Sequence, residues 1–239
     1  MMKVNFIFLG EQHSFEIEKS HYLRRLGFPK DYDVPESIQE SMDWSSQWYF
    51  DKGNPWLHVY ELIVGMENEQ IFLNKKETIA PKVYKRFKKY HVEKAMLIAA
   101  TAGDKVDDET KELWSTDFPD RAFFLETYAS CVTESLVEFA VDQIKYWADQ
   151  KQENVLSRYS PGYPGWELKE QNTLMEIIKN ISEIPINISE TSLLQPLKSQ
   201  LSLVGIHEGE QKEKSIKIEC MQCTFNNCTC RKKEMYIKT

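Results

Sequence analysis

The sequence predicts an α+β domain in which a mixed, largely antiparallel sheet packs against helices, including one long helix. Short apolar runs of strand length alternate irregularly with helical patterns, and one amphipathic pattern continues from 117 to about 149. No unit recurs as an internal repeat. This irregular order favours an α+β domain over a doubly wound parallel sheet. A short cysteine-rich tail follows the domain.

The first half of the chain alternates short strands with helices. Residues 3–9 have the apolar run of a strand, and Tyr22, Leu23 and Leu26 have the spacing of a helix that Gly27 and Pro29 end. The later elements expected here are a helix over 35–49, a hairpin with strands 56–64 and 71–73, a helix over 81–90, a buried strand over 94–101 and a helix over 107–114.

The helix expected over 81–90 carries basic residues around the apolar pair Val83 and Phe87. A nucleic-acid site and a solvated basic face both fit this pattern. We favour the solvated face, because one basic helix does not reverse the charge of an acidic surface.

The second half of the chain is dominated by the long helix expected over 117–149. Pro119 suits its first turn, and apolar residues recur at spacings of three and four: Leu125, Ala129, Val132, Leu136, Ala140 and Ile144. A loop over 152–166, a helix over 171–181 and strands over 185–189 and 201–206 follow. We therefore expect a domain over 1–207, with a charged spacer and cysteine-rich tail over 208–239.

Composition and charge exclude several classes of protein. The 239 residues are 41% hydrophobic and 28% charged, which is typical of a globular domain rather than a disordered chain or a coiled coil. The formal net charge of −7 argues against a general nucleic-acid binder. No window has the roughly 20 apolar residues that span a bilayer, and no secretory signal is visible. We expect a soluble cytoplasmic protein with no membrane partner.

The most unusual segment is Arg158–Gly165, which reads Arg-Tyr-Ser-Pro-Gly-Tyr-Pro-Gly. Two prolines fix φ on either side of Gly162, and the two glycines allow backbone conformations that other residues avoid. Such a stiff loop can expose its backbone amides, and Arg158 can bind a carboxylate through two parallel hydrogen bonds. A tight structural turn and a ligand clamp both account for this pattern.

Arg158–Pro164 resembles the Arg-x-x-x-Gly-Tyr-Pro motif of the activation domain of cobalamin-dependent methionine synthase. Less specific resemblances extend the likeness over most of the chain, in the segments 23–29, 95–103 and 187–205. The chain is similar to a short, stand-alone member of this family.

The resemblance implies a reactivation role in methionine biosynthesis. In this family, S-adenosylmethionine gives a methyl group to cobalt during reductive methylation of cob(II)alamin, and a flavodoxin-like donor supplies the electron. The chain has no room for a cobalamin-binding module, so a separate methionine synthase or related corrinoid protein would hold the cobalamin. A methyltransferase acting on another acceptor is a weaker alternative.

The resemblance also assigns residues to S-adenosylmethionine. Arg158 matches the arginine that binds the methionine carboxylate, Ser160 lies where the family uses backbone atoms, and Tyr163 matches the motif tyrosine. Glu134 resembles a helix glutamate near the ligand ammonium, although without the resemblance we would favour a solvent-facing helix carboxylate paired with a lysine. Glu190 matches a second family segment. The chain departs from the longer members after Pro164, where Gly165-Trp166 replaces Ala-Cys, and this difference alters the floor of the pocket.

Four of the five cysteines lie close together in the tail, at Cys220, Cys223, Cys228 and Cys230. Four thiolates can hold tetrahedral zinc or an iron–sulfur cluster, and this spacing does not separate the two. An exposed, reduced tail is the alternative. A metal- or cluster-carrying interaction protein on the same fold, without S-adenosylmethionine chemistry, is therefore the second functional hypothesis. Cys131 is expected to be a small buried residue of the long helix.

Overall fold

The computed structural model describes residues 6–8, 17–28 and 32–209, with 6–8 described by their backbone. Its helices are α1 (Lys19–Arg25), α2 (Glu36–Lys52), α3 (Pro81–Tyr90), α4 (Lys105–Trp114), α5 (Pro119–Asp149), the 3-10 turn η2 (Leu168–Glu170) and α6 (Gln171–Lys179). Its strands are β1 (Phe6–Phe8), β2 (Trp56–Glu67), β3 (Gln70–Leu73), β4 (Lys76–Thr78), β5 (Lys94–Thr101), β6 (Asn154–Val155), β7 (Asn187–Ile188), β8 (Leu194–Gln195) and β9 (Ser199–His207). The predicted α+β class is confirmed.

One seven-stranded sheet organises the described part of the chain. Its strands follow the order β4-β3-β2-β5-β9-β6, and β1 pairs with the first part of β2. Every pairing in it is antiparallel. The central strand β5 lies between β2 and β9, with Leu97 opposite both Tyr60 and Leu203. The separate β7–β8 hairpin lies beside α6.

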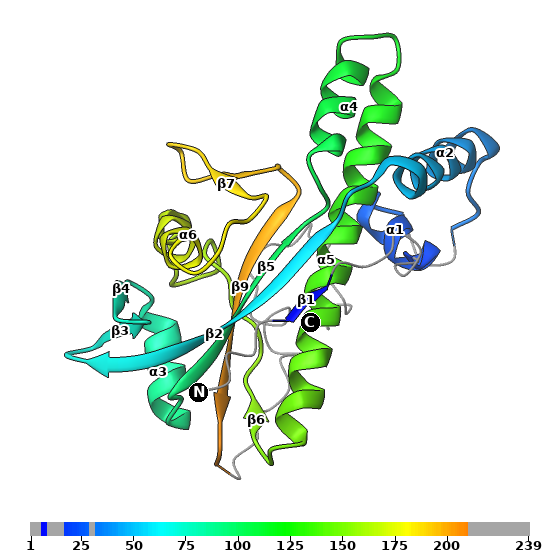
Figure 1. Ribbon diagram of the computed structural model, residues 1–239. Helices are drawn as coiled ribbons and strands as arrows, with labels where there is room; N and C mark the ends of the chain where they lie inside the picture. The colour runs from blue at the N-terminus through cyan, green and yellow to red at the C-terminus, as the bar shows by residue number, and fades with distance from the viewer. Residues whose placement is uncertain (1–5, 9–16, 29–31, 210–239) are drawn as a thin grey trace, which may run out of the picture.

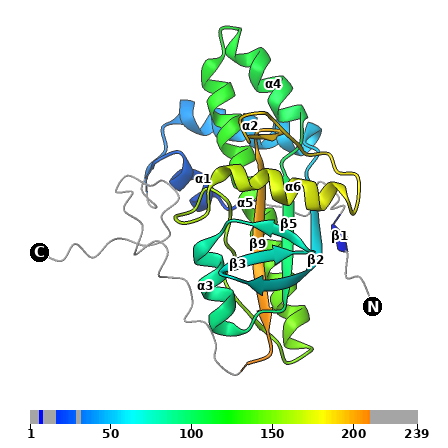
Figure 2. The same cartoon turned by 90° about the vertical axis from the view of Figure 1, so that its left-hand side faces the viewer.

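Helices cover both faces of this sheet, as Figures 1 and 2 show: α5 lies on one face, and α3 and α6 lie on the other. The side chains of β5 alternate between two hydrophobic clusters. Met96 and Ile98 pack in the cluster that contains α5, whereas Ala95 and Leu97 pack in the cluster that contains α3 and α6. Because β5 contributes to both clusters, it is buried along almost its entire length.

Local sequence explains the ends of several elements. Pro81 begins α3, and His91 ends that helix in the left-handed conformation, with its N–H bonded to the carbonyl of Lys88. The β2–β3 turn has positive φ at Asn68 and Glu69, as a two-residue hairpin turn requires.

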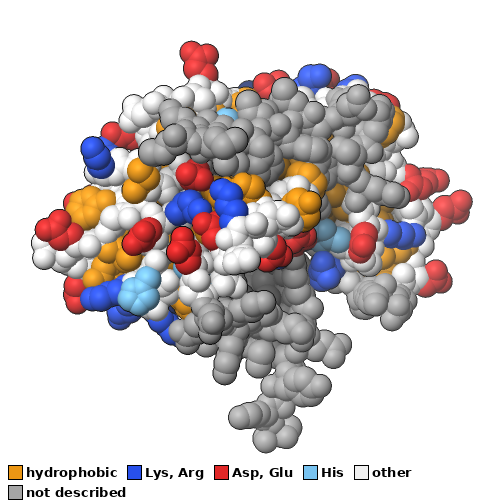
Figure 3. All heavy atoms as spheres, turned by 60° about the horizontal axis from the view of Figure 1, so that its bottom comes forward, with side chains coloured by type: hydrophobic (Ala, Val, Ile, Leu, Met, Phe, Trp, Pro, Cys, Tyr) orange, Lys and Arg blue, Asp and Glu red, His pale blue; other side chains and the backbone are white. Residues whose placement is uncertain are grey.

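Charge is mixed on the end of the molecule shown in Figure 3. Acidic, basic and hydrophobic side chains are interspersed over the part that is coloured by type. None of the helices in the described residues is both long enough and apolar enough to cross a bilayer.

Candidate functional site

The Arg158–Gly165 loop follows β6 and runs along the free edge of β9. The Tyr159 N–H donates to the Leu203 carbonyl at 2.8 Å, and the Leu203 N–H donates back at 2.7 Å. The segment was predicted as a loop throughout, so its pairing with β9 was missed. This pairing fixes the backbone at Tyr159, directly after Arg158.

Short-range hydrogen bonds then close the loop on itself. The Gly162 N–H donates to the Trp166 carbonyl at 2.9 Å, and the Tyr159 hydroxyl donates to the Pro164 carbonyl at 2.6 Å. Gly162 and Gly165 have φ of 90° and 84°, which supports the expectation that both positions need glycine. The loop is therefore held in shape by hydrogen bonds between its own residues.

Arg158 is half-buried at the start of this loop. Its Nη1 atom is shielded from solvent and has no hydrogen-bond partner among the described residues. A buried cationic donor without an acceptor is costly, because it loses water and gains no hydrogen bond. An anionic oxygen beside Nη1 would remove that cost.

Ser160 and Tyr163 have different environments within the loop. The Ser160 side chain is buried, and its hydroxyl lies 2.8 Å from that of Ser202 and 3.3 Å from the amide nitrogen of Gln200. The Tyr163 ring is half-buried and packs edge-on against Tyr159, with centroids 5.3 Å apart. The Ser160 side chain is thus occupied within the protein, and the Ser160 carbonyl accepts a hydrogen bond from the Tyr163 N–H at 3.1 Å.

Glu134 lies on α5 and faces α1. Its Oε2 atom is 3.1 Å from His21 Nε2 and 3.5 Å from Arg25 Nε, and its side chain is only 12% exposed. The lysine partner considered from the sequence is therefore replaced by a histidine and an arginine of α1. A ligand ammonium at Glu134 would share the carboxylate with these two groups.

Cys131 lies one turn before Glu134 on α5 and is fully buried, as predicted. Burial raises the pKa of its thiol to about 12. The thiol is therefore protonated at neutral pH and is not a nucleophile.

Glu190 is exposed at the turn between β7 and β8. That hairpin is attached to α6, because Gln171 Nε2 donates to the Ser192 carbonyl at 2.7 Å. Within the described part of the chain, Glu190 makes no contact with Arg158. The structure therefore joins Arg158, Ser160 and Tyr163 in one loop, while Glu134 and Glu190 lie on separate elements.

α3 supports the loop from the α6 side of the sheet. Arg86 Nη2 donates to the Ser157 carbonyl at 3.1 Å, and its guanidinium lies 5.4 Å from the centroid of the Tyr159 ring. The interpretation of α3 as a solvated basic face missed this residue. The signal was its position: Arg86 follows Val83 by three residues and precedes Phe87, at the border of the buried face.

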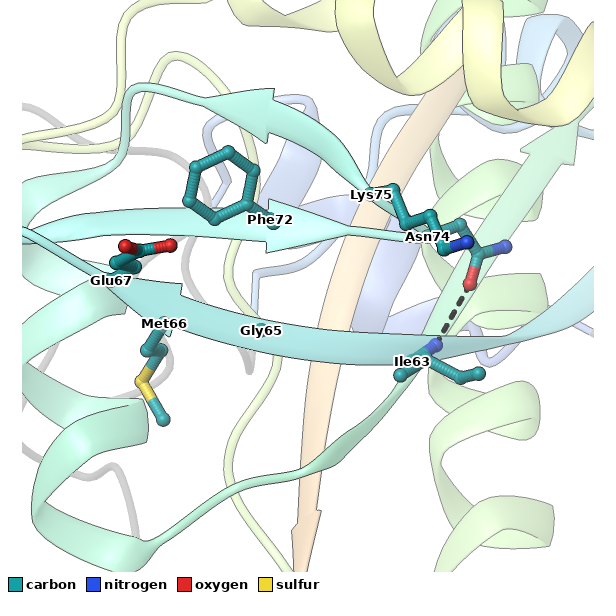
Figure 4. A pocket seen from close by; sticks show the side chains of 7 residues that line it. All are labelled: Ile63, Gly65, Met66, Glu67, Phe72, Asn74 and Lys75. Carbon is teal, nitrogen blue, oxygen red and sulfur yellow. Dashed lines mark hydrogen bonds between the residues drawn. The ribbon is translucent and has the colours of Figure 1, made fainter.

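A separate hollow of about 630 Å³ lies on the β2–β3 hairpin. Figure 4 shows Phe72 and Met66 among its lining residues, together with Glu67 and Lys75. No residue of the Arg158–Gly165 loop lines it. No motif of the sequence predicts a site at this place.

Comparison with solved structures identifies the fold. The chain is similar to the crystal structure of the MetH reactivation domain bound to AdoHcy, with a TM-score of 0.62 and 13% sequence identity. The match covers 89% of this chain and 81% of the other. The chain has a reactivation-domain fold. No family model matches the sequence, and no curated protein matches it.

The zinc or iron–sulfur site predicted at the cysteine tail is a separate question from the fold. Cys220, Cys223, Cys228 and Cys230 lie outside the described residues. The described residues contain no group of three or more His, Cys, Asp or Glu placed to bind a metal ion. The zinc or iron–sulfur site at the tail stays a prediction, for which elemental analysis of anaerobically purified protein is the test.

Proposed function

We propose that this chain binds S-adenosylmethionine and serves as a reactivation subunit for a separate cobalamin-binding methionine synthase or related corrinoid protein. The observation that carries the proposal is the buried, unpartnered Nη1 of Arg158, at the position that matches the carboxylate-binding arginine of the motif. The fold supports it, because the similar MetH reactivation domain was crystallised with AdoHcy, S-adenosylhomocysteine.

The described residues suit the amino acid end of this ligand. Arg158 would donate charge-assisted hydrogen bonds to the carboxylate, and the shielded Nη1 without a partner favours this. The Ser160 backbone and the Tyr163 ring would bound the ligand further along the loop. Glu134 lies 3.5 Å from the Arg25 guanidinium and 3.1 Å from His21 Nε2, so it would attract the ammonium more weakly than a free carboxylate. Glu190 lies in an exposed turn and would contribute least to the affinity for the ligand.

The bound S-adenosylmethionine would supply the methyl group, and cobalt in the partner would accept it together with an electron from a flavodoxin-like donor. The contribution of this chain is positional. A rigid loop that fixes the amino acid end of the ligand limits the directions in which the methyl group can point, and such orientation accelerates transfer between two bound reactants.

Isothermal titration calorimetry with S-adenosylmethionine tests the proposal. We expect the wild type to bind and Arg158→Ala to bind at least tenfold more weakly, because one or more hydrogen bonds to a charged group are lost. Arg121→Ala is the matched control: it removes a half-buried arginine that lies over the Trp44 ring near the start of α5, and it should bind like the wild type. A wild type that does not bind S-adenosylmethionine rules the proposal out.

A second experiment addresses the partner. The protein is mixed with a corrinoid protein in the cob(II)alamin state, a reductant and S-adenosylmethionine with a labelled methyl group. The labelled methyl group should reach cobalt with the wild type, and the amount of label on cobalt should fall strongly with Arg158→Ala. Equal labelling with and without this chain would contradict the reactivation role.

A further inference from the structure

Arg86 of α3 contacts both chain neighbours of Arg158, the residue that the proposed function assigns to the ligand carboxylate. Arg86 donates to the carbonyl of Ser157, the residue before Arg158, at 3.1 Å. The same guanidinium lies over the ring of Tyr159, the residue after Arg158, at 5.4 Å from its centroid. Arg86 therefore contacts the backbone just before Arg158 and the side chain just after it.

The rest of α3 makes this arrangement rigid. One turn before Arg86, the Lys82 side chain packs so closely on Gly165 that a Cβ there would lie 2.8 Å from Lys82 Cγ. One residue after Arg86, Phe87 packs on β9, where a Cβ on Gly205 would lie 2.8 Å from Phe87 Cε1. The helix thus supports the end of the loop at Gly165 and is itself anchored on the strand that the loop pairs with.

The chemistry of this position suits a guanidinium better than an ammonium. A planar guanidinium can donate from its edge to the Ser157 carbonyl while its face lies on the Tyr159 ring. A lysine ammonium can supply the charge and a donor, but it has no planar face to lie on the Tyr159 ring. A shift of Ser157 or Tyr159 would move Arg158, because the three residues are consecutive and Tyr159 is bonded to Leu203.

We infer that Arg86 is a positioning residue that sets the direction of the Arg158 side chain for the carboxylate of the ligand. This inference rests on the proposed function and adds a residue that the motif does not contain. Arg86 does not touch the ligand in this role. Its effect is therefore limited to ligands that have a carboxylate for Arg158.

The test compares two ligands by calorimetry. S-adenosylhomocysteine has the amino acid end, and 5′-methylthioadenosine has the adenosine and sulfur without it. Arg86→Met keeps the apolar stem but removes the donor and the charge. It should weaken S-adenosylhomocysteine binding about tenfold, as loss of a hydrogen bond by a charged group predicts, and should leave 5′-methylthioadenosine binding within about twofold. Arg86→Lys should recover part of the loss.

A double-mutant cycle separates positioning from general damage. In the Arg158→Met background, Arg86→Met should cause no further loss of S-adenosylhomocysteine binding, because the residue it positions is gone. Lys85→Met, at an exposed position of the same helix, should bind both ligands like the wild type. If Arg86→Met does not fold, as judged by circular dichroism, Arg86→Lys carries the same two-ligand comparison.

The outcomes distinguish this inference from the proposed function. Equal losses for both ligands, or unchanged binding of both, would overturn the positioning role while wild-type binding upholds the proposed function. An additive loss in the Arg158→Met background would overturn it as well. A wild type that fails to bind S-adenosylhomocysteine would overturn this inference, and one that also fails to bind S-adenosylmethionine would overturn the proposed function as well.

Discussion

His58 has an unusual environment for a histidine. Its side chain is buried in β2, and its Nε2 atom has no hydrogen-bond partner among the described residues. Its ring centroid lies 4.1 Å from that of Tyr60 and 5.8 Å from that of Trp56, and the pair with Trp56 is edge-on. Burial lowers the pKa of His58, because the protonated form loses its hydration. The folded protein therefore keeps this imidazole neutral.

This lowered pKa predicts a loss of stability in mild acid. Below about pH 6.5, His58 takes up a proton more readily in the unfolded chain than in the folded protein. The free energy of unfolding therefore falls as the pH falls. His58→Phe removes the titrating group and keeps a ring. Between pH 7.5 and pH 5.5, the free energy of unfolding measured by urea denaturation should fall less for the variant than for the wild type.

The control for this prediction is His91→Asn. His91 is exposed and has a left-handed backbone that asparagine tolerates, so the substitution removes an imidazole without a change in burial. Its pH dependence should follow that of the wild type. A His58→Phe variant with the wild-type pH dependence would contradict the role given to burial.

At the scale of elements, the contact between α3 and β9 is tight because Gly205 has no side chain. A Cβ at Gly205 would lie 2.8 Å from Phe87 Cε1 and 3.1 Å from Leu156 Cδ1. Gly205→Ala should therefore lower the free energy of unfolding by about 1–3 kcal/mol, the usual cost of overpacking a core. Chemical denaturation measures this change.

Gly65→Ala offers a matched comparison in the same sheet. Gly65 is exposed on β2, and its added Cβ would make an ordinary contact of 3.6 Å with Phe72 Cβ. The change in stability should stay within about 0.5 kcal/mol. Similar losses in the two variants would show that loss of glycine, rather than the approach of α3, determines the effect.

Elements with strong local signals could be predicted from sequence. The bounds of α3 and β5 agree with the prediction, because Pro81 marks a helix start and an uninterrupted apolar run marks a buried strand. The strands β4, β6 and β8 were missed. Each is two or three residues long and is defined by partners elsewhere in the fold, so a local pattern carries little information about it.

The same division applies to the candidate site. The Arg158–Gly165 loop could be predicted, because its prolines and glycines act on their own backbone. The partners of Glu134 could not be predicted, because His21 and Arg25 are distant in sequence and contact Glu134 only after α1 packs on α5. For Arg86, the sequence indicated a position at the border of the buried face but not its contacts with Ser157 and Tyr159.

At the scale of the whole molecule, the sheet separates two hydrophobic clusters and belongs to both. Its centre, β5, has hydrogen-bonded neighbours on both sides and helices over both faces, whereas β4 is an edge strand with one neighbour. Opening of β5 requires disruption of both clusters, while β4 can open alone.

Amide hydrogen exchange should follow this difference. We expect the slowest exchange at Met96–Ala100 of β5 and at the residues of β9 that pair with them, and exchange faster by at least tenfold at Lys76–Thr78 of β4. Exchange resolved by residue with NMR would measure it. Equal protection of β4 and β5 would indicate that the sheet opens only as a single unit.

The pairing of β5 with β9 also has a consequence for synthesis in the cell. About 100 residues separate these partners, which the ribosome adds in roughly 5–20 s. During that interval the edge of β5 that later pairs with β9 is unpaired, and the β9 residues that complete both clusters are absent. The nascent chain therefore passes through a period in which an apolar strand edge is available to other chains. Expression at lower temperature or with chaperones that bind extended apolar segments should raise the yield of folded protein.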